Sequence, residues 1–576
     1  MKRILAAFVA LATLAISGCA ASSGVVPNTF ISAAANGALV SLNPDVVTTL
    51  ASQKIADEVA NLTTESFYQL NEAGELEANT GFGTVTVESR SPFTVTYEVA
   101  GGRNWSDGQA VDSADLVLSL AAATGPEGRR FYSRREGNGL QFATVKSVGL
   151  NSITLTFSQP VSDWRTALRV ATPAHVVAQV GLALDSADTA KSAVIQAYQQ
   201  RDGAKLSALA KAYRSIYEAR EGNLTDAAFV SSGAYLVSAV SPKEIITLKA
   251  NPNYRGNFGP KVETVNIRLY EDSMEALSAM NEGKVDIIAA TESGLAKIPD
   301  LIGMVSTLSS MKAEYALKDS TTADMVLFNF GSESVFDPAT YGDNPGRAAA
   351  LRKAFMSLVP KSRIFQAAGA SLAVSSADSF VYPNTSNFYK AAASGNGSEN
   401  YLLQDVEQAA EIIDASGVDT PIEVRVLFDS TNPRSVEQYK EIFKLAESAG
   451  FNLVSVASST PSRHLLSGNF DVFIGPRPLL GVSGSDPMLL TTSSITRYQD
   501  KSVNALLVKY AKATKEIDQA AVLERIDARL FATGYGLPLY QAPNLVIYRS
   551  SVSGLRVAPF GDSATWGYWT WSVSPK

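Results

Sequence analysis

Few residues in this 576-residue chain have types and spacing that could support catalysis. The sequence contains one cysteine, Cys19, and two histidines, His175 and His464. An internal disulfide is therefore impossible, and a histidine-rich transition-metal site is not expected. No nucleophile elbow, His-Glu-x-x-His pair, phosphate-binding loop or dinucleotide glycine fingerprint occurs, and no carboxylate pair is set apart by spacing as acid and base. We expect no catalytic residues, no bound metal and no cofactor.

His175 is the histidine whose position most invites a chemical role. It lies in the run Thr172-Pro173-Ala174-His175-Val176, just after a proline. The side chain could act as a ligand or a base, since an imidazole changes its charge near neutral pH. A histidine that caps the start of a helix is the more common arrangement, and it is the one we predict here.

The amino-terminal residues predict processing and lipidation. A basic start at residues 1–3 precedes the apolar run Ile4 to Leu14, which is too short to span a bilayer. The run ends in Ile16-Ser17-Gly18-Cys19, which resembles a bacterial lipobox, in which the thiol accepts lipid. The alternative is a plain signal peptide with an incidental cysteine. We predict a signal peptide at 1–18, lipidation of Cys19, a tether at 19–29, and an extracytoplasmic protein anchored to the cell membrane, facing outward or into a periplasm.

Composition limits the class of protein and of partner. Apolar residues make up 46% and charged residues 18%, which suits large cores and not disorder. The length suggests roughly three or four domain-sized units. A formal net charge of −7, without basic runs, argues against nucleic acid as a partner.

One local unit stands out near the start of the chain. The stretch Phe93 to Val99 alternates as a half-buried strand does, and Ser106-Asp107-Gly108 has the composition of a turn. Asp112 is placed to cap a helix, and Asp115 lies in its first turn, where negative charge suits the helix dipole. By itself, a strand, a turn and a capped helix predict packing and no particular function.

The amino-acid sequence of this unit resembles the signature of the extracellular solute-binding proteins of the peptide/nickel class, family 5, which serve ABC importers. Further stretches resemble the family's sequence in the same order: Arg103 to Leu116, Ser232 to Leu236, Ile245 to Gly256, Phe470 to Gly475 and Leu537 to Gln541. We interpret the signature at 103–116 as a determinant of the fold and not as a cargo contact.

The resemblance implies an α/β, two-lobed periplasmic-binding-protein-like fold of type II, in its large class with an extra subdomain. Helix-then-strand alternation independently predicts an α/β second lobe with a partly parallel sheet. Crossover strands near Tyr270 and Leu539 would form the hinge. The expected bounds are 30–68, 230–270 and 541–571 for lobe I, 69–229 for its extra subdomain, and 271–540 for lobe II.

The family's cleft implies a set of contact residues. In relatives, the segment after the Leu42-Asn43-Pro44 corner reaches the ligand, as does the far end of the strand at 470–475. Asp486-Pro487 matches an Asp-Pro pair of the family's peptide binders. The aspartate that precedes it in those relatives and pairs with the peptide's amino terminus is replaced by Ser483. The predicted contacts are Thr48, Thr49, Ser52, Ile55, Gly475, Pro476, Arg477 and Asp486.

The implied function is capture of a peptide or peptide-like solute for a permease and its ATPase, by a monomer. With Ser483 at this position the anchoring carboxylate is missing, unless Asp486 has moved into its role. We therefore expect the cargo to be held mainly through its backbone, with little demand for a free amino terminus. Arg477 could meet a carboxylate or could simply be solvated. The alternatives are a nickel complex or an oligosaccharide as cargo, or a surface lipoprotein with a chaperone-like or enzymatic role.

Overall fold

The computed structural model describes residues 24–47, 50–72, 74–129, 131, 133, 139–220, 224–290, 298–307, 312–342, 344, 346–369, 375–481, 490, 495–559 and 563–575. The predicted signal peptide and Cys19 lie outside these ranges, as do Thr48, Thr49 and Asp486. Within them, no helix has both the length and the apolar composition needed to cross a bilayer.

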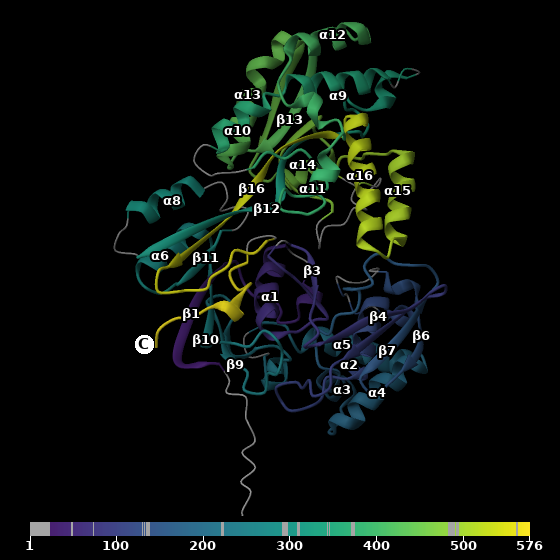
Figure 1. Cartoon of the computed structure of the whole chain (residues 1–576), viewed down its shortest axis with the longest axis vertical. Coiled ribbons are helices and arrows are strands. Elements are labelled where there is room, and N and C mark those ends of the chain that lie inside the picture. The colour runs from purple at the N-terminus through teal and green to yellow at the C-terminus, as the bar shows by residue number, and fades with distance from the viewer. Residues whose placement is uncertain are drawn as a thin grey trace, which may run out of the picture.

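A ten-stranded sheet runs through both halves of the molecule, in the order β14-β13-β15-β12-β16-β11-β1-β10-β9-β8 (Figure 1). Its strands are β1 (Val26–Asn36), β8 (Tyr235–Ser241), β9 (Ile245–Ala250), β10 (Val262–Tyr270), β11 (Ile287–Ala289), β12 (Ala313–Phe328), β13 (Ile422–Asp429), β14 (Phe451–Ser458), β15 (Val472–Pro478) and β16 (Gly536–Arg549). β1 starts four residues before the predicted lobe boundary at residue 30, because Val26 already pairs with Val262.

Two separate hydrophobic cores cover the two ends of this sheet. Ile31, Val265 and Trp105 belong to the first core, whereas Val326 and Ile474 belong to the second. Buried apolar surface is the main stabilising contribution in each. The predicted two-lobed α/β architecture is therefore confirmed.

The second lobe is built as the helix–strand alternation predicts. β13 pairs in parallel with both β14 and β15, as expected for a partly parallel sheet. Its helices are α9 (Gly346–Leu358), α10 (Lys361–Gly369), α11 (Tyr389–Ala393), α12 (Val406–Ser416), α13 (Pro433–Ala446), α14 (Pro461–Ser467), α15 (Lys501–Lys512) and α16 (Glu516–Thr533). α13 shows why the sequence starts a helix there: Asn432 caps it by accepting from the Arg434 amide, and Pro433 opens its first turn.

The extra subdomain has its own sheet and helices. Its four strands lie in the order β4-β5-β7-β6 and are antiparallel. The strands are β4 (Gly83–Arg90), β5 (Phe93–Val99), β6 (Ala143–Val148) and β7 (Ser152–Phe157), and the helices are α2 (Ser113–Thr124), α3 (Ala174–Leu182), α4 (Ala187–Gln199) and α5 (Gly203–Ser215). In Figure 1 this unit lies beside α1 (Leu50–Thr63) in the lower half of the molecule.

The remaining elements are short or connect the larger ones. They are the hairpin β2 (Tyr68–Leu70) and β3 (Leu76–Ala78), the helices α6 (Ser273–Asn281) and α8 (Ile298–Thr307), and 3-10 turns at Pro44–Val46, Pro126–Gly128, Leu140–Phe142, Asp226–Phe229, Pro338–Tyr341, Ser398–Tyr401, Glu447–Ala449 and Tyr568–Thr570. The aromatic carboxyl-terminal tail docks on the first core through Tyr568 and Trp571.

β12 and β16 are the long strands that join the two cores. They pair antiparallel from Ala313 and Arg549 to Leu327 and Gly536, with register shifts between Asp319 and Ala323 and between Asp324 and Met325. Leu539 lies in β16, in agreement with its predicted crossing. The other crossing lies later in the chain than Tyr270, because α6, β11 and α8 precede β12.

The lobes touch at the turn between α15 and α16. The Ser162 amide donates to the Ala511 carbonyl (2.9 Å), and Trp164 Nε1 donates to the Thr514 carbonyl (3.0 Å). Arg90 donates to the Thr514 hydroxyl (2.9 Å). These hydrogen bonds hold the extra subdomain against the second lobe.

Candidate functional site

The carboxyl ends of the second-lobe strands face the first lobe. β12 runs from the first lobe into the second core, and β15 is antiparallel to it, so β15 runs back and ends at Pro478, opposite Thr322. β13 is parallel to β15 and ends at Asp429. Because open α/β sheets bind ligands outside the carboxyl ends of their strands, this edge is the candidate cargo site.

A buried polar cluster lies at this edge. The strand pairing places Asp324 opposite both Pro476 and Tyr540. Gln438, on α13, donates through Nε2 to Asp324 Oδ2 (2.7 Å) and to the Tyr540 hydroxyl (2.9 Å). Burial, with the nearby negative charge of Asp324, raises the pKa of Tyr540 well above its usual range, so the phenol stays protonated. The cluster therefore joins β12, β16 and α13 at one point.

The other face of β15 presents an arginine on an aromatic ring. The Arg477 guanidinium lies over the Phe473 ring, 4.7 Å from its centroid. A Cβ on Gly475 would approach Phe473 Cζ to 2.7 Å, so the glycine leaves room for the ring. Three of the predicted contacts, Gly475, Pro476 and Arg477, are thus placed together at the candidate site, with Arg477 half-buried.

The other two described candidates, Ser52 and Ile55, lie on α1 in the first lobe. Ser52 is half-buried, and Ile55 has 0% exposed surface within the first hydrophobic core, where it packs with Val59. The Ile55 side chain therefore contributes packing to the lobe in this structure. Cargo contact by these residues, and by Thr48, Thr49 and Asp486 outside the described ranges, stays a prediction.

The signature around Trp105 is fully engaged in internal hydrogen bonds. Trp105 is buried, and its Nε1 donates to Asp115 Oδ2 (3.2 Å), which also accepts from the Asp112 amide (2.9 Å). The other oxygen of Asp115 accepts from the Ala174 amide, at the start of α3 (2.7 Å). One carboxylate thus fixes the tryptophan turn, α2 and α3 together, which is a structural role.

His175 extends this network. Its Nε2 lies 2.7 Å from Asp107 Oδ2, and its side chain is buried. Burial raises the pKa of Asp107, but the hydrogen bonds that its carboxylate accepts from His175 and from backbone amides, with the nearby His175 charge, together outweigh burial and hold this pKa below its usual value. The predicted capping role is wrong, because Pro173 occupies the N-cap position and the imidazole instead ties α3 to the signature turn.

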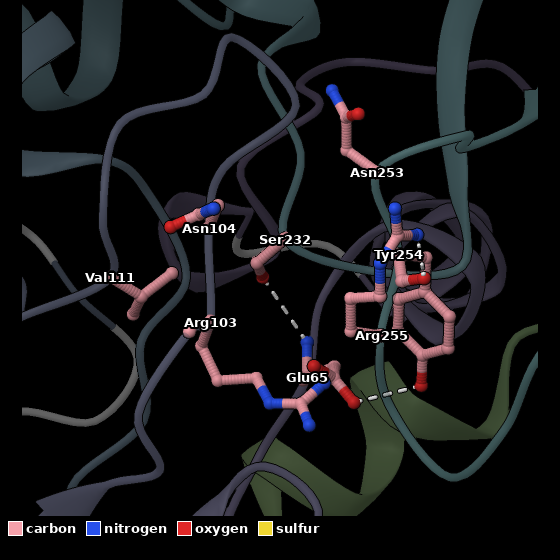
Figure 2. Close-up of a pocket in the computed structure, with 9 residues that line it drawn as sticks. Glu65, Arg103, Asn104, Val111, Ser232, Asn253, Tyr254 and Arg255 are labelled. Carbon is pink, nitrogen blue, oxygen red and sulfur yellow. Dashed lines mark hydrogen bonds between the residues drawn. The ribbon is translucent and has the colours of Figure 1, made fainter. Parts of the chain in front are cut away.

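A small polar pocket lies where the start of the signature stretch, at Arg103 and Asn104, meets the Asn253–Arg255 turn (Figure 2). The Tyr254 hydroxyl donates to Glu65 Oε1 (2.8 Å), and the Arg103 guanidinium lies beside the same carboxylate in the view. Burial raises the pKa of Glu65, against the opposing effects of Tyr254 and Arg103. No sequence motif surrounds Glu65, so no local signal marks it as a buried carboxylate. These side chains interact with one another, which indicates a structural pocket in the first lobe.

Comparisons with known proteins agree with this architecture. Residues 83–494 match the family model for bacterial extracellular solute-binding proteins, family 5. The chain is similar to an uncharacterised lipoprotein of Mycobacterium tuberculosis, at 23% identity over 94% of this chain and 92% of that protein. Two solved structures share the fold: a periplasmic EDTA-binding protein, EppA (TM-score 0.76, 19% identity, 95% of this chain and 97% of that one), and the oligopeptide-binding protein AppA from Bacillus subtilis in complex with a nonapeptide (TM-score 0.63, 11% identity, 95% and 100%). This chain belongs to the bacterial extracellular solute-binding proteins, family 5, the binding components of ABC importers.

Proposed function

We propose that this protein captures a peptide or peptide-like solute between its lobes and delivers it to a membrane permease. The observation that supports this best is the second-lobe edge, where β15 ends facing the first lobe with Pro476 and Arg477 half-buried and Pro478 exposed. Because Pro476 and Pro478 carry no N–H, this strand end offers mainly carbonyl oxygens to the N–H groups of an extended peptide, and contacts of that kind do not depend on a charged amino terminus. The same fold holds a nonapeptide in AppA.

Calorimetry with matched free and N-acetylated peptides tests the cargo class and its mode of binding. We expect both forms to bind with affinities within tenfold of each other, because Ser483 stands where related peptide binders have the carboxylate that pairs with the amine. A loss on acetylation of more than about tenfold, or 1.4 kcal/mol, would show that a carboxylate does anchor the amine. If neither form binds across a varied peptide set, the peptide assignment is wrong.

Anchoring through Cys19 is the second part of the proposal. The lipobox-like run ends at the chain's one cysteine, and the similar mycobacterial protein is named a lipoprotein. Two acyl chains give durable attachment to a bilayer, whereas one is marginal. Cys19→Ser should release the folded protein from membranes in a fractionation experiment. Retention of a processed Cys19→Ser protein in the membrane fraction would contradict lipid anchoring.

A further inference from the structure

The first-lobe end of the large sheet has a covered side and an open side. Residues paired across neighbouring strands point to the same side of a sheet, and successive residues along a strand alternate between the sides. Ile31, Val265 and Leu248 align across β1, β10 and β9, and each has 0% exposed surface in the first core. α1 packs on this side through Ile55 and Val59. This inner side therefore carries the packing that stabilises the lobe.

The residues that alternate with these form the open side, called the outer face below. Phe30, Thr264, Lys249 and Leu236 align in one row across β1, β10, β9 and β8. Phe30 is 38% exposed, and Lys249 is also exposed. The outer face consists of this row and the aligned residues beyond it, all half-buried or exposed: Ala239, Ser241, Ile245, Thr247, Asn266 and Arg268. It extends across four strands of the sheet.

The outer face is basic, although the protein is acidic. Its charged residues are Lys249 and Arg268, and it includes no aspartate or glutamate, whereas the whole chain has a formal net charge of −7. Glu263 belongs to the inner alternation of β10 and accepts from a backbone amide of β1 (2.7 Å). Glu244 lies beyond the strands, in the turn between β8 and β9. Positive charge gathered on one face favours an anionic partner.

The chain reaches this face from the proposed lipid anchor over a short segment. Five peptide units join Cys19 to Gly24, and they span at most about 18 Å when fully extended. β1 begins two residues later at Val26, whose amide donates to the Lys261 carbonyl (2.8 Å). In Figure 1, β1, β10 and β9 lie together in the lower part of the molecule. An anchor at Cys19 therefore keeps this end of the sheet close to the bilayer.

We propose that the outer face rests on an anionic lipid surface when Cys19 carries its lipid. The inference rests on the proposed anchoring and extends it by identifying which side of the first lobe meets the bilayer. Basic side chains are attracted to an anionic leaflet, and Phe30, in the same row as Lys249, supplies apolar surface at the headgroup boundary. The first lobe then lies with α1 turned away from the bilayer, instead of rotating freely about its tether.

Lysine footprinting on vesicles tests this orientation. The chain from Cys19 onward is coupled through its one thiol to a maleimide lipid, which reproduces the short tether whether or not a cell lipidates this residue. On vesicles of phosphatidylglycerol and phosphatidylcholine, acetylation of Lys249 should be at least about fivefold slower than on phosphatidylcholine alone. Lys440, on α13 with its side chain 60% exposed, is the internal control and should react equally on both.

Equal rates of Lys249 acetylation on the two kinds of vesicle would overturn the proposal, and this arm needs no variant to fold. Failure of the anchor itself is detected separately, by the fractionation of Cys19→Ser, and does not change the footprint of the coupled protein. Protection of Lys249 that grows with protein concentration in the absence of vesicles would assign the outer face to a second copy of this chain and would also overturn the lipid assignment.

A matched pair of arginine variants tests whether charge drives the contact. Arg268→Gln should restore most of the Lys249 reactivity, whereas Arg463→Gln, at an exposed position on α14 in the second lobe, should leave the protection intact. Raising the ionic strength to about 1 M, where the screening length falls to about 3 Å, should remove the protection in the wild type. Protection that survives both Arg268→Gln and high salt would contradict binding to an anionic surface.

Discussion

Two buried polar clusters at helix starts differ in how many of their hydrogen-bonding groups are paired. Asp115, in the first turn of α2, accepts hydrogen bonds from Trp105 and from two backbone amides. Arg434, in the first turn of α13, has three guanidinium nitrogens without a hydrogen-bond partner in the described residues, and its ion pair with Asp324 is long, at 3.5 Å. Both side chains are buried, and they differ in how far the described residues meet their hydrogen-bonding capacity.

The comparison also separates a recognisable motif from a specific site. The Trp105 signature identifies the family because its interactions are internal and define how the extra subdomain packs. Asp324, Arg434 and Gln438 have no local pattern, yet they lie at the edge that faces the other lobe. The stretch that identifies the family and the buried polar cluster at the second-lobe edge are therefore in different lobes.

Removing the signature tryptophan should have the largest effect on stability. Trp105 has 1% exposed surface, and truncation of such a residue costs about 3–5 kcal/mol. We expect Trp105→Ala to lower the free energy of unfolding by about this amount in chemical denaturation, with little change in the affinity of the folded fraction for cargo. Trp105→Phe, which keeps an aromatic ring, should cost less. A selective loss of cargo affinity without a loss of stability would contradict the structural role.

The pH dependence of stability offers a sharper test of the same cluster. Burial raises the pKa of Asp115 from 3.8 to about 6. A raised folded-state pKa means that the stability contribution is complete below pH 3.8 and is lost as the pH rises through about 6. Wild-type protein should therefore lose on the order of 2 kcal/mol more than Asp115→Asn between pH 4 and 7. Parallel stability curves for the two proteins would show that Asp115 does not titrate in this range.

The contact between the lobes should show the smallest effect. Trp164→Phe removes the donor to the Thr514 carbonyl, and a hydrogen bond of this kind contributes about 1 kcal/mol. If the contact favours closure, the closed population should fall about fivefold. Small-angle scattering without cargo should then give a larger radius of gyration than for the wild type. Thr514→Val, which removes only the hydroxyl bound by Arg90, serves as a milder companion, and unchanged scattering in both would assign the contact no part in closure.

Local sequence pattern predicted the elements well where caps and periodicity agree. The helix Ser273–Asn281 has Asp272 as its N-cap and Gly283 at positive φ just beyond its end. β12 is different, because its apolar run begins only at Met325 whereas the strand begins at Ala313. Pairing with β16 there overrides local composition.

The site was only partly predictable, for a physical reason. Gly475, Pro476 and Arg477 follow one another in a single strand, so locating the strand end locates all three. Asp324, Arg434 and Gln438 meet only through the register of β12 against β16 and the packing of α13, which no local window contains. A charged residue beside an otherwise apolar strand was the available signal for Asp324. Ile55 lies in the first hydrophobic core, because the face of α1 that packs on this core is apolar. An apolar residue on this helix is therefore no signal for cargo contact.

The register shift between Asp319 and Ala323 has a mechanical consequence. Because β12 and β16 pair on both sides of this interruption, the joint between the lobes should be stiffer than a flexible loop, with bending concentrated at residues 320–322. The register shift also sets which side chains of the strand beyond it point to each face of the sheet. Deleting one residue there would turn alternate side chains to the opposite face and point Asp324 away from α13. The length of this short segment, as much as the identity of its residues, is thus under constraint.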